Sequence, residues 1–222
     1  MYYLLDESEL VFPHPSLADE DGLLAVGGDL SIERLLLAYE NGIFPWYNED
    51  SPILWYAPLE RFVLSPEKIR ISKSLKQILR SKKFQVTIDK DFSSVIKNCA
   101  VISRKDQDGT WIVSDMQDAY NRLHEAGYAH SVEVWQGEEL VGGLYGVQIG
   151  KIFCGESMFS KVSNASKIAL VHLAKNFGLS LIDCQIPSEH LTKMGAELIP
   201  QEEYLSILHT QQSIPYDFQR TF

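Results

Sequence analysis

A single carboxylate interrupts the stretch LVGGLYGVQIGKIFCGESMFS, residues 140–160, which consists mostly of apolar residues and glycine. This carboxylate belongs to Glu156. Burying an unpaired carboxylate is costly, so the side chain must be exposed, paired, or placed to meet a ligand. The pattern therefore makes Glu156 a candidate functional residue within a segment that is typical of core strands.

A second polar group occurs in the segment LIDCQ, residues 181–185. On a β-strand, Asp183 and Gln185 would project from one face while Cys184 points to the other. Such a pair, taken alone, often only caps neighbouring backbone. Together with Glu156, however, the pair would bring carboxylates and an amide to the ends of strands. This combination suits proton transfer or the binding of a cation.

Aromatic and apolar residues near these polar groups are candidates for substrate contacts. Trp46 in FPWY and Trp111 in GTW lie in predicted loops, where they could stack on nucleic-acid bases or fill a seam between domains. A second set could line a pocket for a flexible apolar side chain or could simply form core. This set consists of Leu144, Phe153, Met158, Leu173 and Phe177.

Several kinds of chemistry lack a motif in this sequence. There is no phosphate-binding loop, no HExxH and no G-x-S-x-G nucleophile elbow, and the histidines lack metal-ligand spacing. The three cysteines are odd in number and show no CxxC pair, which favours buried thiols in a reducing cytoplasm. We therefore expect no metal and no cofactor. No segment approaches the roughly 18 consecutive apolar residues of a membrane span, and we see no signal peptide.

The net charge of −10 is distributed unevenly along the chain. Residues 1–65 contain twelve acidic and two basic residues, whereas the remaining 157 residues contain 18 of each. Within that neutral part, ISKSLKQILRSKK has five basic residues and no acid. The spacing of Lys73, Lys76, Arg80 and Lys83 places them on one face of a predicted helix. This face is either a solvated surface or a stripe that binds phosphates.

The same change of composition near residue 65 predicts a small acidic N-terminal domain, residues 1–65, and a second domain, residues 66–222. In the first, Ser31 is the expected N-cap of the helix IERLLLAYENG, and Gly42 ends that helix. In the second, strands and helices alternate irregularly around a hairpin at residues 131–154. This order predicts an α+β fold with a mixed, mostly antiparallel sheet. Residues 211–222 are expected to form a loose or wrapping tail.

Several long motifs occur in a fixed order: GLLAVGGDLS, RLLLAYENGIFPW, AYNRLHEAGYAHSVEVW, FCGESMFS, LIDCQ and MGAELIP. From about Gly22 to Leu208, the chain resembles the bacterial leucyl/phenylalanyl-tRNA–protein transferases. The resemblance implies an acetyltransferase-like (GNAT-like) second domain without coenzyme A. It also implies transfer of leucine or phenylalanine, and weakly of methionine, from tRNA to proteins that begin with Arg or Lys. Such proteins are thereby marked for N-degron degradation.

The resemblance also implies roles for individual residues. Asp183, Gln185 and Glu156 fall on catalytic positions, Trp46 and Trp111 on positions that hold the terminal adenosine, and the apolar set on the pocket for the transferred side chain. We expect Gln185 to orient the attacking amine and Asp183 to polarise Gln185, while both carboxylates attract the basic acceptor. Aminoacyl-tRNA and the acceptor protein are the expected partners of a cytoplasmic enzyme, which we expect to be a monomer.

Three alternatives stay open at this point. A coenzyme A–dependent acetyltransferase would need a glycine-rich pyrophosphate loop, but the corresponding segment reads KVSNASK, without glycine. An aminoacyl-tRNA–dependent enzyme of cell-wall peptide synthesis would differ in its acceptor. A non-catalytic tRNA- or peptide-binding module would bind without turnover. The sequence does not decide between leucine and phenylalanine as the preferred donor.

Overall fold

The computed structural model describes residues 2–101, 112–214 and 218, and Trp111 therefore lies outside the described residues. The strands are β1 (Tyr3–Leu5), β2 (Leu23–Gly27), β3 (Phe44–Pro45), β4 (Leu54–Tyr56), β5 (Glu60–Leu64), β6 (Gln85–Ile88), β7 (Ala129–Gln136), β8 (Glu139–Ile149), β9 (Ile152–Ser160), β10 (Leu181–Gln185) and β11 (Glu197–Pro200). The α-helices are α1 (Ile32–Glu40), α2 (Lys73–Arg80), α3 (Phe92–Val101), α4 (Ser114–Glu125), α5 (Ala165–Asn176), α6 (Glu189–Lys193) and α7 (Gln201–Gln212). Two 3₁₀ helices, Pro15–Leu17 and Pro66–Lys68, complete the described elements.

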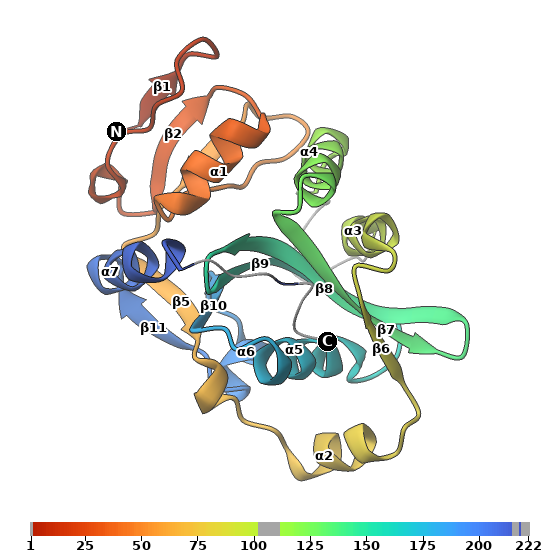
Figure 1. The fold of residues 1–222 in the computed structure, drawn as a ribbon. Helices are drawn as coiled ribbons and strands as arrows, with labels where there is room; N and C mark the ends of the chain where they lie inside the picture. Colours follow the sequence, from red (N-terminus) through yellow and green to blue (C-terminus); the bar gives the residue numbers. More distant parts are fainter. Residues whose placement is uncertain (1, 102–111, 215–217, 219–222) are drawn as a thin grey trace.

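The strands form two sheets. A four-stranded sheet in the order β1-β2-β4-β3 belongs to the N-terminal part, and a seven-stranded sheet in the order β11-β5-β10-β9-β8-β7-β6 forms the centre of the molecule (Figure 1). In the larger sheet only β9 and β10 run parallel, while the other neighbouring pairs are antiparallel. The predicted α+β fold with a mixed, mostly antiparallel sheet is confirmed.

The seven-stranded sheet has a hydrophobic core on each face, because neighbouring residues of a strand point to opposite sides. On β8, Leu144 packs into the core beneath α5, while Tyr145 packs into the core that α3, α4 and the N-terminal part cover. Figure 1 shows α3 and α4 on one side of the sheet and α5 on the other. Among the described helices, none has the length and apolar character needed to cross a bilayer.

Most predicted elements are present, with two differences in detail. Ser31 caps α1 as expected, since its side chain accepts a hydrogen bond from the backbone N–H of Arg34, and Gly42 follows the helix with φ of 71°. The capping-box spacing of Ser114 and Gln117 predicts Ser114 as the N-cap of α4, but the helix begins at Ser114, with Val113 as its N-cap and no side-chain cap bond. In the predicted tail, residues 211 and 212 end α7, and Phe218 is buried, which agrees with a wrapping tail at that residue.

The two parts of the chain are joined more closely than the change of composition indicates. The strand β5, which lies within residues 1–65, belongs to the seven-stranded sheet and not to the N-terminal one. One core also contains residues of both parts, such as Leu35 of α1 and Met116 of α4. The division into residues 1–65 and 66–222 as separate domains stays a prediction.

Candidate functional site

The site begins where the parallel strands β9 and β10 separate. They pair from Leu181 opposite Ile152 to Asp183 opposite Cys154, and no pairing follows. There the register of β10 against β5 shifts, and Gln185 takes a φ of 63°, which turns the chain away from β9. Because β9 continues along β8 to Ser160, a gap opens in the sheet.

This gap contains a cavity of about 570 Å³, a size that suits a small-molecule ligand. It reaches both faces of the sheet, since Phe44 belongs to one core and Leu173 to the other. One side, which we call the apolar wall, consists of Leu144, Phe153, Met158, Leu170 and Leu173. The remaining sides come from Phe44–Trp46, from Gly155–Ser157 on β9, and from Ile182 and the segment Cys184–Leu191.

The cavity brings together most of the predicted catalytic and substrate-binding residues. Glu156 and Gln185 line it, and so do Trp46, Leu144, Phe153, Met158 and Leu173. Two predicted residues are not in its lining: Phe177 stacks on Phe218 with ring centroids 4.2 Å apart, and Asp183 is buried behind the cavity. Phe177 thus lies outside the lining of this cavity, and its predicted contact with the transferred side chain stays a prediction.

Sequence reasoning missed several lining residues. Leu170 precedes Leu173 by three positions, a helical spacing that could have revealed it. The segment from Ile186 to Leu191 gave no comparable signal, because only the turn after Gln185 brings it to the cavity. Its His190 has a buried Nε2 atom without a hydrogen-bond partner among the described residues, and burial lowers the pKa of this histidine.

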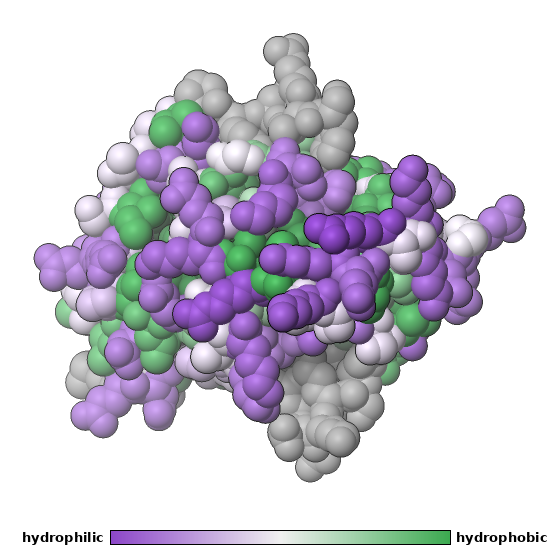
Figure 2. All heavy atoms as spheres, turned by 90° about the horizontal axis from the view of Figure 1, so that it is seen from below, coloured by the Kyte–Doolittle hydropathy of each residue, from purple (hydrophilic) through white to green (hydrophobic). Residues whose placement is uncertain are grey.

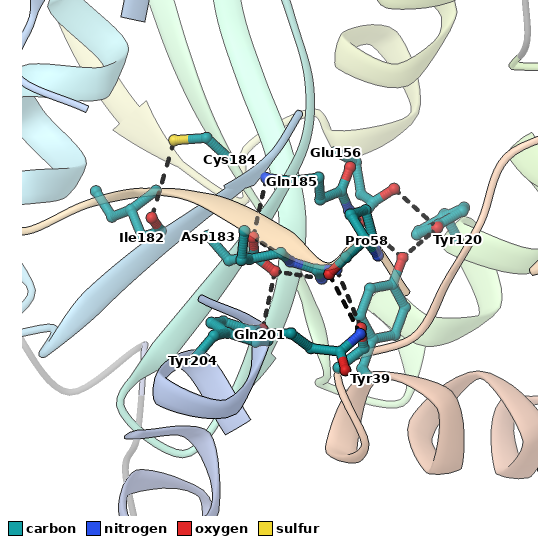
Figure 3. Close-up of polar contacts among 12 residues, drawn as sticks. Tyr39, Pro58, Tyr120, Glu156, Ile182, Asp183, Cys184, Gln185, Gln201 and Tyr204 are labelled. Atoms are coloured by element: carbon teal, nitrogen blue, oxygen red, sulfur yellow. Dashed lines mark hydrogen bonds and ion pairs between the residues drawn. The ribbon is translucent and has the colours of Figure 1, made fainter. Parts of the chain in front are cut away.

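Three side chains donate hydrogen bonds to Glu156. Its Oε1 accepts from the Tyr39 hydroxyl and from Gln185 Nε2, each at 2.7 Å, and its Oε2 accepts from the Tyr120 hydroxyl at 3.0 Å. Figure 3 shows how Tyr39 and Tyr120, from α1 and α4, converge on this carboxyl group. Only 7% of Glu156 is exposed, so the pairing that its sequence context requires comes from two helices distant in the chain.

The number of available protons favours a protonated Glu156. The hydroxyls of Tyr39 and Tyr120 contact each other, which closes a ring of three groups. If Glu156 is ionised, the two hydroxyl protons serve its two oxygens and none is left for the contact between the tyrosines; if it is protonated, its own O–H donates to one hydroxyl and each of the three contacts has a proton. Burial raises the pKa of Glu156 to about 7, against the opposing effect of its hydrogen bonds. Burial and Glu156 also raise the pKa of each tyrosine well above its usual value, so both stay protonated.

Asp183 has a different environment, although it lies on the neighbouring strand. It is fully buried and forms a two-point ion pair with Arg61 of β5, whose Nε and Nη2 lie 2.8 and 2.7 Å from the carboxylate oxygens. The Tyr204 hydroxyl and the backbone N–H of Gln185 also donate to it, each at 2.9 Å. With its charge balanced by Arg61, Asp183 holds the turn at Gln185 in place and does not face the cavity.

The predicted shared face of Asp183 and Gln185 stays a prediction, because the cavity that Gln185 lines reaches both faces of the sheet. The register shift breaks the alternation of the strand, so that Gln185 lines the cavity together with Cys184. The bond to Glu156 then orients the Gln185 amide, because Nε2 is its donor, and Oε1 is left as the acceptor of the group. A cavity wall that combines a carboxyl of raised pKa with an oriented amide oxygen can bind and deprotonate an amine.

The predicted basic stripe is only partly helical. Lys73, Lys76 and Arg80 lie on α2, but the helix ends at Arg80, so Lys83 follows it and does not share its face. All four side chains are exposed, and none forms an ion pair with a described residue. Hydrophilic side chains cover much of the face on which α2 lies (Figure 2). Among the described residues, no group of three His, Cys, Asp or Glu side chains could hold a metal ion.

Fold and site together define an α+β protein in which a cavity has an apolar wall beside a paired carboxyl and amide group. A family model described as leucyl/phenylalanyl-tRNA protein transferase matches residues 63–209, and the model of that family's N-terminal domain matches residues 28–59. The chain belongs to this family. It is an aminoacyltransferase that transfers an aminoacyl group from tRNA to protein.

Curated relatives support this assignment over nearly the whole chain. The leucyl/phenylalanyl-tRNA–protein transferase of Syntrophus aciditrophicus is 58% identical over 202 residues, which cover 90% of this chain and 84% of the relative. That of Flavobacterium johnsoniae is 55% identical and covers 95% of this chain and 100% of the relative. The resemblance inferred from the sequence motifs is thus confirmed.

Solved structures give more distant matches. The structure of L-PGS from Bacillus licheniformis is 14% identical, with a TM-score of 0.41, over 77% of this chain and 56% of that one. A GCN5-related N-acetyltransferase from Kribbella flavida is 10% identical, with a TM-score of 0.34, over 75% of this chain and 59% of that one. Similarities of this size carry no argument about activity.

The raised pKa of Glu156 predicts a pH-dependent stability. The folded protein keeps the proton up to about pH 7, whereas the ordinary value is 4.5. The contribution of the Glu156 proton to the free energy of unfolding is therefore complete below pH 4.5 and is lost as the pH rises to about 7. A shift of this size corresponds to about 3 kcal/mol. The Glu156→Gln variant cannot ionise there, so its free energy of unfolding relative to wild type should increase by that amount across this range.

Urea denaturation of both proteins at a series of pH values would measure this difference, since all other titrating groups are common to the two. Parallel stability curves for wild type and Glu156→Gln would contradict the raised pKa.

Proposed function

We propose that the protein transfers leucine or phenylalanine, and weakly methionine, from tRNA to the N-terminal Arg or Lys of an acceptor protein. The observation that carries this proposal is that a single cavity joins the apolar wall to the Glu156–Gln185 pair. An apolar donor side chain and a cationic acceptor would thus meet at the place where the new peptide bond forms.

The apolar wall favours an uncharged donor side chain of moderate size. Its leucines, phenylalanine and methionine offer dispersion contacts but no hydrogen-bonding groups, and Met158 can adapt to branched or planar shapes. Trp46 lines another side of the cavity, where its ring is available to stack on the terminal adenine of tRNA. The corresponding role of Trp111 stays a prediction.

The polar pair favours an acceptor amine. Gln185 Oε1 can accept a hydrogen bond from the α-amino group, while Glu156 supplies negative charge when it is ionised. We assign Asp183 a positioning role, in place of the direct contact with substrate that its sequence position indicated. Its bond to the backbone N–H of Gln185 holds the turn from which the amide reaches the cavity.

The reaction mainly requires that the two substrates be oriented and that one group accept a proton. The aminoacyl ester needs no further activation. The aminoacyl ester is already activated, so a neutral α-amine can attack its carbonyl carbon and release the tRNA hydroxyl. An α-amino group has an ordinary pKa of about 7.7–8.0, and a carboxyl group with a pKa of about 7 is well matched to accept its proton. Holding both substrates in one cavity supplies the orientation.

The wider role that we propose follows from the acceptor rule. A protein that gains an N-terminal leucine or phenylalanine would be marked for degradation through the bacterial N-degron pathway. We propose that the enzyme acts as a monomer in the cytoplasm, where aminoacyl-tRNA is made and used.

The acceptor rule can be tested with purified protein and labelled leucyl-tRNA. We expect label to appear on a peptide that begins with Arg, and none on the same peptide beginning with Ala, because only the first offers a cation to the Glu156 side of the cavity. Transfer to both peptides, or to neither, would contradict the proposed acceptor. Phenylalanyl-tRNA should give the same pattern.

The role of Gln185 predicts a selective loss of turnover. Gln185→Ala should lower kcat/KM for transfer by at least about 100-fold, because the amine loses its oriented acceptor, while the Kd for leucyl-tRNA stays within about threefold. Gln148→Ala is a suitable control, since this buried glutamine of β8 donates to the Gly150 carbonyl and does not line the cavity. An equal loss of activity in both variants would mean that Gln185 has only a structural role.

The exposed basic residues of α2 predict salt-dependent tRNA binding. Replacing Lys73, Lys76 and Arg80 with glutamine should weaken binding and reduce the slope of log K against log salt by about two to three, because each phosphate contact releases condensed counterions. Replacing Lys90 and Lys97, which are exposed elsewhere on the surface, with glutamine is the control, and because it removes two positive charges it is compared with the double replacement of Lys73 and Lys76. An unchanged slope would make α2 a solvated surface helix.

A further inference from the structure

One residue of the C-terminal tail, Phe218, is held between two aromatic rings. Phe218 is 2% exposed, and its ring lies 4.1 Å from that of His130 and 4.2 Å from that of Phe177, with interplanar angles of 13° and 24°. Two rings that lie this close and nearly parallel to a third must cover its opposite faces. Phe218 therefore fills a slot between β7 and the end of α5.

The slot itself is well fixed. Asp89 holds the ring of His130 through an Oδ2–Nδ1 distance of 2.7 Å, and the histidine is only 3% exposed. Phe177 is completely buried at the C-cap of α5 and also packs edge-on against His172. Both walls of the slot thus exist independently of the tail, and the tail contributes the ring that occupies it.

The slot adjoins the cavity through Phe153. This residue belongs to the apolar wall, and its ring centroid lies 5.8 Å from that of Phe218. Another part of the same ring abuts Gly146, where an added Cβ atom would lie 2.6 Å from Phe153 Cε1. Phe153 thus meets the backbone of β8 at one part of its ring and the side chain of Phe218 at another, and of these two contacts only the second can be removed by a side-chain substitution.

From these contacts we infer that Phe218 is a positioning residue that sets the depth of the apolar wall and thereby ranks the donor side chains. The inference rests on the proposed function, since it concerns which aminoacyl group the cavity accepts. Phe218 acts through Phe153: with the slot filled, Phe153 cannot retreat, and the cavity fits the smaller leucine. With the slot empty, Phe153 can move back and admit a longer, planar side chain.

The test is a comparison of leucyl- and phenylalanyl-tRNA as donors to one Arg-initiated peptide. Phe218→Ala should raise the ratio of kcat/KM for phenylalanyl over leucyl transfer by about tenfold, the lower bound for a difference of one methylene in an apolar pocket. The change should appear mainly as a higher KM for leucyl-tRNA. Phe218→Leu keeps most of the filling and should give an intermediate ratio, and it serves as the informative variant if Phe218→Ala does not fold.

Phe12→Ala is the matched control, because it removes an aromatic contact with Trp55, away from the cavity, and should lower stability without changing the donor ratio. A Phe218 variant that loses both activities equally, with the ratio unchanged, would overturn this inference alone. A wild-type protein that transfers neither amino acid would overturn the proposed function and this inference with it.

Discussion

The ion pair between Arg61 and Asp183 is the interaction on which the rest of the site depends. Both residues are almost completely buried, at 1% and 0% exposure. Taking two charges out of water is costly, and only close geometry with further hydrogen bonds offsets that cost. Here the guanidinium makes two bonds to the carboxylate, donates a third to the Gly42 carbonyl at 3.0 Å, and lies over the rings of Phe44 and Tyr204.

These contacts join the N-terminal part to the large sheet beside the cavity. Gly42 and Phe44 come from the N-terminal part, Arg61 and Asp183 from adjacent strands of the large sheet, and Tyr204 from α7. Although burial alone would lower the pKa of Arg61, Asp183 raises it above its ordinary value, so the guanidinium stays charged. Removing either partner would leave an uncompensated charge where four segments meet.

The two carboxyl groups of the site illustrate how environment assigns different roles to similar residues. Asp183 faces a cation and a backbone N–H, and it maintains the turn at Gln185. Among the described residues, Glu156 accepts hydrogen bonds only from neutral donors, and burial raises its pKa to about 7. A carboxyl group whose pKa lies near 7 can exchange protons at neutral pH, whereas a carboxylate in a tight ion pair serves to position other groups.

The sequence by itself determined the elements and most of the site. Alternation and capping patterns located α1, the long hairpin and β10, because these signals depend on neighbours in the chain. The apolar residues around Glu156 identified most of the apolar wall, and the long motifs identified the family. Only the tertiary structure decided which groups pair: the approach of Tyr39 and Tyr120 to Glu156, of Arg61 to Asp183, and of Phe218 to its slot. These contacts join residues distant in the chain, and the break at Gln185 is a positive φ held by Asp183, which periodicity cannot predict.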